Sequence, residues 1–416
     1  MKPRRRVHAP KPKIIMENQI INHLTDNDVY TFSVCYLYLN KFPRAYGRYT
    51  FIDRNDSVYP PGFAEEVKNQ LKGMEAIRIS DEEVAYMQKR CYYFPVWFYT
   101  FLKGFRFNAD EVSVSQDHSG RLRISVEGLL WKTVFWEVPI LAIISEIKHR
   151  LCGHFDGYDP EREYQKSLDK GCHLIRNGLS FAEFGTRRRF SFDHHDMVLR
   201  SLIEAGEICA KEPGQLFGTS NMYFAMKYNL IPIGTMSHQV ISFCGAIFGY
   251  KEANFLAMKH WQETFDSDLG TFLYDTYGWN AFQENFSKKY AKLFDGLRVD
   301  SGDNFEAVDK IMAKYQSLNI NPKTKALTFS NGLRVDEAVE IHKYCQGKIN
   351  DNYGIGTFLT CDVTGVEPMN IVMKLTAAKL TEKKHWQKAI KLSDDKGKYT
   401  GDPDEVDIAK RTLGIE

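Results

Sequence analysis

From about residue 180 onward the chain repeats one pattern, in which a short apolar run ends in a small or polar residue and a helix-like stretch follows. Strands that alternate with helices predict a parallel sheet. In a βα barrel the polar strand ends meet at one rim, where the active site lies, whereas a doubly wound open sheet gathers them along one edge. The seven runs end in FAEFGTR (181–187), LFGTSN (216–221), IPIGTMSH (231–238), TFLYDT (271–276), GLRVDSGD (296–303), LTFSNG (327–332) and YGIGT (353–357).

The first 128 residues lack this rhythm, because they mix helices and strands. Leu122, Ile124 and Val126 alternate with polar residues, which is the periodicity of a strand. The segment 139–150 opens with proline and places apolar residues at helical spacing. We therefore expect a helix there that buries one face.

Composition narrows the class of protein. The net charge is only +2, so the surface as a whole does not attract nucleic acid. The eight cysteines are scattered and form no CxxC pair, which favours a reducing cytoplasm over a disulfide framework or a zinc finger. No segment is long and apolar enough to predict a membrane span. Residues 1–15 are basic and proline-rich, so we expect a disordered tail or a true start at Met16, rather than a nucleic-acid-binding arm or a signal peptide.

Several strand ends carry groups that suit a phosphorylated ligand. Gly354, Gly356 and Thr357 offer open backbone N–H groups and a hydroxyl, which can hold phosphate, although glycine also simply ends strands. Asp300 follows a strand and could hold ribose hydroxyls or Mg²⁺; the alternative is a turn in which Asp300 caps the next helix.

Two further clusters are basic or imidazole-bearing. If the strand before them continues, Arg187 and Arg189 share one face and Arg188 opposes them, so two guanidinium groups could face a phosphate; a solvated basic cluster is the alternative. His238 follows IPIGTMS and is expected on the rim, as a base, a metal ligand, a phosphoryl acceptor or a structural histidine.

The remaining histidines do not predict a metal site. His194 and His195 are adjacent after Ser191; if Ser191 caps a helix, they fan around that helix and do not converge. Cys152 with His154, and Cys172 with His173, lack the spacing and number of zinc ligands. The residues alone thus indicate an α/β enzyme with a rim that binds an anionic, phosphorylated ligand.

The same segments, taken together and in order, resemble the nicotinate phosphoribosyltransferase family. TDNDVYTFS near the start, WEVPILAIISE, and KLSDDKGK near the end extend the likeness from about His23 to the C-terminus. The resemblance implies an irregular seven-stranded α/β barrel with a second α+β domain built from N- and C-terminal segments. We expect the barrel over 139–365 and the second domain over 16–138 plus 366–416.

The resemblance also implies a reaction: nicotinate and phosphoribosyl pyrophosphate give nicotinate mononucleotide and pyrophosphate, with ATP hydrolysis coupled through a phosphohistidine. ATP and Mg²⁺ are the implied co-substrate and metal, without a tightly bound organic cofactor. By likeness of GTMSHQ to the family's motif, the phosphorylated residue is His238. A homodimer with a shared active site is implied as well, and neither nucleic acid nor membrane is an expected partner.

Other roles carry over from the resemblance by position. Phe184 would stack on the pyridine ring, Tyr30 would be a second stacking aromatic supplied by the partner subunit, and Arg187 would contact pyrophosphate. Arg298 would face the nicotinate carboxylate. The implied site is completed by Asp300 at the ribose or phosphohistidine, by Ser330, Asn331, Gly354, Gly356 and Thr357 at ribose and phosphate, and by Asp275 at Mg²⁺.

Three positions bear on the alternatives. Ser220 stands where nicotinamide phosphoribosyltransferases carry an aspartate, so the residue favours nicotinate over nicotinamide, since two carboxylates about 4 Å apart repel by about 4 kcal/mol at an effective dielectric near 20. Gln239 and Asn331 stand where the family commonly has acidic residues. They leave open weaker activity, altered ATP coupling, or a catalytically silent nucleotide-binding paralogue.

Overall fold

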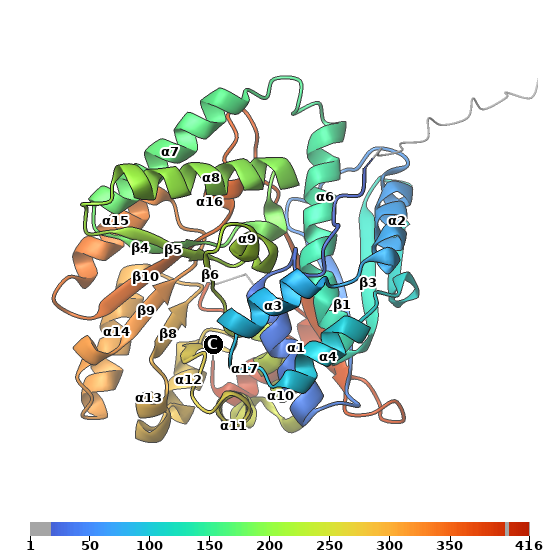
Figure 1. The fold of residues 1–416 in the computed structure, drawn as a ribbon. Coiled ribbons are helices and arrows are strands. Elements are labelled where there is room, and N and C mark those ends of the chain that lie inside the picture. Colours follow the sequence, from blue (N-terminus) through green and yellow to red (C-terminus); the bar gives the residue numbers. More distant parts are fainter. Residues whose placement is uncertain (1–17, 396–398, 416) are drawn as a thin grey trace, which may run out of the picture.

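The computed structural model describes residues 18–395 and 399–415, so the predicted N-terminal tail lies outside the described residues. Its largest element is a seven-stranded parallel sheet that curls into a half-barrel (Figure 1). The strand order is β6-β5-β4-β10-β9-β8-β7, and each adjacent pair is parallel. The strands are β4 (Ser180–Glu183), β5 (Gln215–Thr219), β6 (Ile231–Pro232), β7 (Thr271–Leu273), β8 (Gly296–Val299), β9 (Ala326–Phe329) and β10 (Asn350–Ile355).

All seven strands predicted from the sequence are confirmed. Helices follow the strands as a βα architecture requires, because each parallel strand needs a crossover connection. Between the described residues of β6 and β7 no pairing closes the ring. The helices on this side are α7 (Pro160–Arg176), α8 (Phe192–Ile208), α9 (Met222–Lys227), α10 (His238–Phe248), α11 (Ala253–Phe265), α12 (Gly278–Asn285), α13 (Lys288–Leu293), α14 (Asn304–Ser317), α15 (Val335–Cys345) and α16 (Thr357–Thr360).

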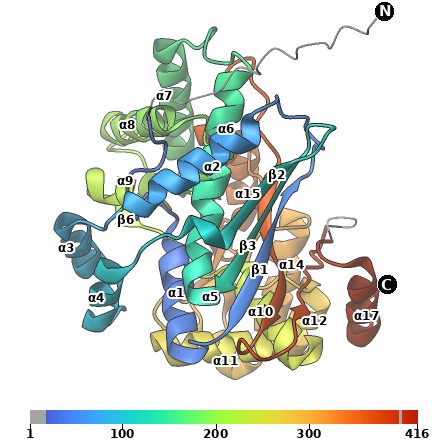
Figure 2. The ribbon, with the colours of Figure 1, turned by 90° about the vertical axis from the view of Figure 1, so that its right-hand side faces the viewer.

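A second, antiparallel sheet combines the two end segments of the chain (Figure 2). Its order is β12-β11-β1-β3-β2, so β11 from the C-terminal segment lies between β12 and the N-terminal β1. The predicted second domain from both ends is therefore confirmed as an architecture. The strands are β1 (Tyr46–Asp53), β2 (Val112–Gln116), β3 (Leu122–Leu129), β11 (Ile371–Lys379) and β12 (Gln387–Lys388).

The helices of this part are α1 (Val29–Lys41), α2 (Phe63–Gly73), α3 (Asp81–Arg90), α4 (Val96–Gly104), α5 (Leu130–Thr133), α6 (Glu137–Leu151) and α17 (Pro403–Leu413). The predicted helix over 139–150 exists as α6, but the expectation of one buried face is wrong. Every residue from Glu137 to Ile147 is buried. The reason is that α6 contacts α2 and β11 as well as the turn after β4, so its flanks are covered too.

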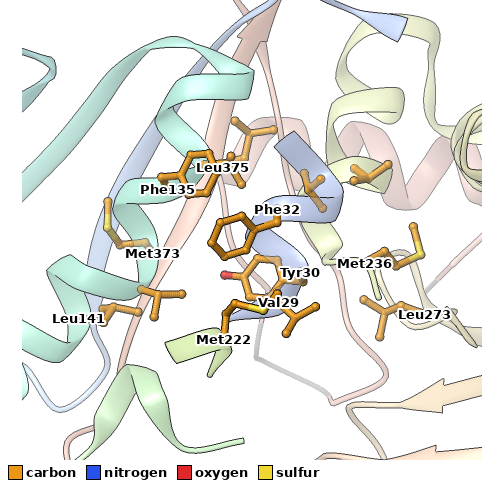
Figure 3. Packing of buried hydrophobic residues seen from close by; sticks show 14 of the residues in the cluster. Val29, Tyr30, Phe32, Phe135, Leu141, Met222, Met236, Leu273, Met373 and Leu375 are labelled. Atoms are coloured by element: carbon orange, nitrogen blue, oxygen red, sulfur yellow. The ribbon is translucent and has the colours of Figure 1, made fainter. Parts of the chain in front are cut away.

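The core continues from one sheet to the other through the start of α1. Figure 3 shows the ring of Tyr30 among buried side chains that come from α9, α6 and β11. Val29 and Phe32 are fully buried, and Tyr30 is 8% exposed. Within the described residues no helix is long and apolar enough to cross a membrane.

Candidate functional site

Two cavities lie at the C-terminal ends of the parallel strands, where the predicted rim should be. The large cavity has a volume of about 530 Å³ and the small cavity about 70 Å³. Both are lined by Arg187, Arg298, Asp300, Lys374 and Lys391. The large cavity also holds most of the predicted site residues, namely Phe184, Ser330, Asn331, Gly354, Gly356 and Thr357.

The glycines of the large cavity have a packing requirement that the sequence did not reveal. A Cβ atom on Gly354 would lie 2.4 Å from the ring of Phe184, and one on Gly356 would lie 3.0 Å from the Phe184 carbonyl oxygen. Only glycine allows β10 and the loop after β4 to approach so closely. The loop therefore keeps its backbone open to the cavity while it seats Phe184 beside it.

His238 is the first residue of α10 and lines the small cavity. Its Nδ1 lies 3.0 Å from Thr276 Oγ1, and its Nε2 lies 3.0 Å from both Asp300 Oδ2 and Lys391 Nζ. A neutral imidazole nitrogen either donates or accepts, so Nε2 bonds to only one of these two groups at a time. Either tautomer leaves one ring nitrogen with a lone pair.

Burial, more than any neighbouring charge, favours the neutral form of His238. Burial and then the Lys391 ammonium lower the pKa of His238 to about 4, against the opposing pull of Asp275 and Asp300. Burial disfavours the charged form of Asp300, but Arg298 and then His238 outweigh it and hold the pKa of Asp300 well below its usual range. A neutral imidazole beside an ionised carboxylate is the state that a nucleophilic histidine needs.

Asp275, the second acidic residue of this cluster, fits a divalent cation. Asp275 is fully buried, and its Oδ1 has no hydrogen-bond partner among the described residues. One ligand atom each of His238, Asp275 and Asp300 lie within 4.8 Å of one another. Carboxylates are the ligands Mg²⁺ prefers. Lys391 Nζ, 3.5 Å from Asp275 Oδ2, already places one positive charge beside them.

Arg298 joins the catalytic cluster to the β9 loop. Its Nη2 donates to Asp300 Oδ1 at 2.8 Å and its Nε donates to Ser330 Oγ at 2.7 Å. Two of its five N–H donors are thus used, and the others remain for a ligand in the cavities that it lines. Asn331 donates to the Gly302 carbonyl at 3.0 Å and so ties the β8 and β9 loops together.

Tyr30 lies in the site of its own chain, where the family resemblance had implied that the partner subunit supplies it. It lines the small cavity, donates to Glu137 Oε2 at 2.8 Å, and has the Arg187 guanidinium 5.9 Å from its ring centre. The long sequence separation between Tyr30 and the rim motifs is bridged within one chain, because α1 enters between the two sheets.

Ser220 is buried and lines neither cavity. Its hydroxyl donates to Asp28 Oδ1 at 2.8 Å, and Arg187 Nε lies 3.4 Å from Asp28 Oδ2. The carboxylate that position 220 lacks is thus supplied by Asp28 in an ion pair. Burial raises the pKa of Asp28, although Arg187 opposes the shift.

The three arginines after β4 do not keep the alternation expected of a continuing strand. β4 ends at Glu183 and a 3-10 turn covers Thr186–Arg188, so the side chains diverge. Arg187 and Arg188 line the large cavity, and Arg188 Nε donates to the Ile371 carbonyl at 2.9 Å. Arg189 is fully buried in a two-pronged ion pair with Asp26, at 2.7 and 2.8 Å. The prediction that Arg187 and Arg189 face one ligand is therefore wrong.

The structure decides three points that the sequence left open: the cap of α8, the state of the cysteines and the role of Asp300. Ser191 caps α8 as expected and accepts from the His194 backbone N–H, while His195 pairs with Glu183 at 2.8 Å. All eight cysteines are free thiols. The helix after β8 is capped by Asp303, so the alternative in which Asp300 only caps that helix is wrong.

Sequence reasoning missed two lysines in the site. Lys391 belongs to the KLSDDKGK segment, which carries part of the family likeness. Lys374 is the only charge in the apolar run IVMKLTAA (371–378) of β11, and this lone charge in a buried strand was the available signal. Neither could be placed in the site without knowing that β11 folds back onto the rim.

The comparisons with known proteins agree with this geometry. The model of the nicotinate phosphoribosyltransferase family matches residues 179–416, and the model of that family's N-terminal domain matches 25–145. A nicotinate phosphoribosyltransferase of Chromohalobacter salexigens is 41% identical over 397 residues, which are 95% of this chain and 99% of the relative. One from Desulforapulum autotrophicum is 41% identical over 93% of this chain and 97% of its own. The solved nicotinate phosphoribosyltransferase of Porphyromonas gingivalis superposes with a TM-score of 0.90 at 44% identity, over 95% of this chain and all of the other. The chain belongs to the nicotinate phosphoribosyltransferase family.

Proposed function

We propose that this enzyme joins nicotinate to the phosphoribosyl group of phosphoribosyl pyrophosphate, and that it couples this reaction to ATP hydrolysis through a phosphorylated His238. Family membership supports the transferase reaction, and the relatives named above carry that activity in their names. The coupling rests on one observation: a neutral histidine stands between Asp300, Thr276 and Lys391 beside the wall that both cavities share.

The covalent step follows from this arrangement. A lone pair of the His238 imidazole attacks the terminal phosphorus of ATP, the bond from that phosphorus to the bridging oxygen breaks, and ADP leaves with the electron pair. Asp300 stabilises the positive charge that the ring gains, and Lys391 stabilises the phosphoryl oxygens. Water later cleaves the N–P bond and releases phosphate. Phosphorylation also adds negative charge beside Lys391 and Arg298, which changes their affinity for pyrophosphate.

The large cavity is the proposed place of the nucleotide product. Gly354, Gly356 and Thr357 hold the 5′-phosphate, Phe184 stacks on the pyridine ring, and Arg298 binds the carboxylate. Ser330 and Asn331 lie at the ribose. Mg²⁺, when bound, neutralises pyrophosphate charge, and Asp275 and Asp300 are the residues that would hold it.

Nicotinamide is the alternative substrate, and the contacts of Asp28 bear on the choice between the two substrates. Ser220 donates to Asp28, so a carboxylate is present near position 220 but is paired with Arg187. Parallel assays with nicotinate and nicotinamide decide between the two. We expect nicotinate to be preferred in the wild type and Ser220→Asp to shift the preference towards the amide; equal use of both substrates would contradict this assignment.

A silent paralogue is the second alternative, since Gln239 and Asn331 lack the negative charge common in the family. Gln239 accepts a hydrogen bond from Tyr49, and Asn331 donates one to the loop after β8, so both have structural contacts here.

A homodimer with a shared active site and a cytoplasmic location remain part of the proposal. Sedimentation of the active enzyme tests the dimer, and a fully active monomer would rule out the shared site.

The deciding experiment uses ATP labelled at the γ-phosphate, followed by alkaline gel analysis and peptide mapping. We expect acid-labile label on the peptide that contains His238, and nicotinate mononucleotide formation that ATP stimulates. Label on another peptide, together with ATP-stimulated synthesis, would refute the role of His238. No product from either pyridine, under conditions in which the protein is folded, would favour the silent paralogue.

A further inference from the structure

The C-terminal segment 391–395, here called the strap, contacts the loops after β7 and β8 through hydrogen bonds. Its first residue, Lys391, places its Nζ 3.0 Å from His238 Nε2. Two residues later, Ser393 has a φ of 92°, a left-handed conformation that serine rarely adopts. Contacts on either side of Ser393 must therefore hold the strap in this shape.

Asp394 anchors the strap, although it lines neither cavity. Its Oδ1 accepts from the Trp279 backbone N–H at 2.8 Å, and its Oδ2 accepts from Lys310 Nζ at 3.0 Å. Gly278 and Gly302 have positive φ, and a Cβ atom on either would lie 3.1 Å from Asp394. The Asp394 side chain therefore occupies a seat formed by α12, α14 and the loop after β8.

The aromatic side chains around it hold Lys310 in place for this ion pair. Its Nζ lies 5.3 Å from the ring centre of Tyr274 and 5.5 Å from that of Trp279. The Lys310 side chain is 27% exposed and that of Asp394 is 14% exposed. Solvent thus screens this pair less than it screens an ion pair on the open surface.

The backbone of Asp394 extends this contact into the site. Its N–H donates to Ser301 Oγ at 3.2 Å, and the Ser301 hydroxyl donates to Asp275 Oδ2. Because the Ser301 oxygen accepts from Asp394, its single hydrogen is directed to Asp275. Asp275 Oδ1 keeps no hydrogen-bond partner among the described residues, which leaves it for the proposed cation. The seat of Asp394 thus controls two neighbours of the site, Lys391 and Ser301.

We propose that Asp394 is a positioning residue for the ATP-coupled step, and that it acts from outside both cavities by seating the strap. Its side chain keeps Lys391 beside His238, and its backbone N–H orients Ser301. The inference rests on the proposed function, which makes His238 the phosphoryl acceptor. Loss of the carboxylate should let the left-handed backbone of the strap relax, so that both groups move away from their present positions.

The test compares Asp394→Ala, Asp394→Asn and Lys310→Met with the wild type in nicotinate-stimulated ATP hydrolysis. We expect Asp394→Ala to lower kcat about tenfold or more, while the KM for nicotinate stays within about threefold, because the groups around the phosphoryl acceptor are misplaced and the large cavity keeps its pyridine-binding groups. Asp394→Asn keeps an acceptor for the Trp279 N–H, so it should lose less. Asp309→Asn is the matched control, because Asp309 precedes Lys310 on α14 but accepts from Tyr344.

A double-mutant cycle and hydrogen exchange separate positioning from a general loss of stability. Asp394→Ala and Lys310→Met remove one shared contact, so the double variant should lose no more than the larger single effect. Hydrogen exchange is measured without turnover and should become faster at the backbone amides of residues 279 and 394 in Asp394→Ala. Asp309→Asn should leave both amides unchanged.

An unchanged kcat in Asp394→Ala, with a wild type that hydrolyses ATP, would overturn the inference, and so would an equal loss in Asp309→Asn. A change in the KM for nicotinate as large as the change in kcat would overturn it too. If Asp394→Ala does not fold, Asp394→Asn and Lys310→Met decide, since both remove the ion pair. A wild type that makes mononucleotide without any ATP hydrolysis refutes the proposed coupling, and the inference falls with it; the behaviour of the wild type therefore distinguishes the two failures.

Discussion

The large and the small cavity share five residues, yet they are built from different kinds of structure. Loops and glycines after the parallel strands form much of the large cavity, whereas side chains of α1, α6, α10 and the antiparallel sheet enclose the small one. Their volumes, about 530 and 70 Å³, suit a nucleotide and a group no larger than a phosphoryl or a few waters. One set of cations thus borders two spaces of different size, an arrangement that suits the proposed coupling of two chemical steps.

The largest effect is expected from His238→Ala, which removes an imidazole that lines the small cavity. We expect nicotinate-stimulated ATP hydrolysis to fall by about two orders of magnitude or more, because the nucleophile is lost. A slow, ATP-independent synthesis should persist, since the large cavity is intact. His173→Ala is the control, as His173 is exposed on α7. Full ATP coupling in His238→Ala would show that the small cavity has no such role.

Arg298→Ala tests the shared wall. The charge-assisted bond to the substrate carboxylate is worth about 1.5–3 kcal/mol, so kcat/KM for nicotinate should fall about 10-fold to 100-fold more than for nicotinamide. Both substrates should also lose some activity, because Arg298 holds Asp300 and Ser330. Steady-state kinetics with both pyridines give the ratio. An equal loss for the two substrates would remove Arg298 from the carboxylate pocket.

Gly354→Ala should disturb the large cavity more than the small one. The added methyl group would meet the Phe184 ring at 2.4 Å, and forcing the ring aside costs about 1–3 kcal/mol. We expect a rise in KM for nicotinate of roughly tenfold, with a smaller effect on the labelling of His238 by ATP. Gly206→Ala on α8 is the control, because its Cβ would meet nothing within 4 Å. Equal damage to synthesis and labelling would mean that the cavities do not act separately.

A smaller effect concerns acid stability and compares His238 with two histidines outside the cavities. Burial, before any charge, lowers the pKa of His149 and His194 to about 3, and that of His238 to about 4. Below the unfolded value near 6.5 the unfolded chain binds protons that the folded chain does not, so stability is present above that pH and is lost as pH falls towards 4. At pH 5.5 each histidine should remove about 1 kcal/mol from the free energy of unfolding.

Denaturant midpoints at pH 7.5 and 5.5 measure this loss. His194→Gln should shrink the pH difference by the share of one histidine, and ligands that bind at His238 should leave the contribution of His149 untouched. A stability that does not change across this window would show that these imidazoles are not held neutral.

The ends of the parallel strands were predictable because a buried strand is apolar. The polar residues that follow each apolar run in the sequence therefore indicate where the strand ends. The same logic placed His238, Asp300 and Gly354 on one rim. The prediction was wrong for Arg187 and Arg189, because the local sequence does not show where β4 ends. It also does not show that Arg189 forms an ion pair with Asp26, which is distant in sequence. The prediction also failed at α6, because α2, β11 and the turn after β4 cover its flanks and leave no exposed polar face.

Long-range placement explains the other omissions. Lys374 and Lys391 reach the site only because β11 lies between β1 and β12, a pairing across more than three hundred residues that no local pattern encodes. Tyr30 is a further case of long-range placement: it is distant in sequence from the rim motifs, and α1 brings it to the small cavity of its own chain.

Because β11 lies in the middle of the antiparallel sheet, the order in which the chain is synthesised affects when the site is completed. A ribosome makes His238, Asp275 and Asp300 well before it makes Lys374 and Lys391, and β1 keeps an open edge until β11 arrives. An interrupted chain therefore carries the imidazole that would spend ATP but lacks the lysines that flank it. If His238 accepts a phosphoryl group as proposed, an incomplete chain lacks both lysines that border that step.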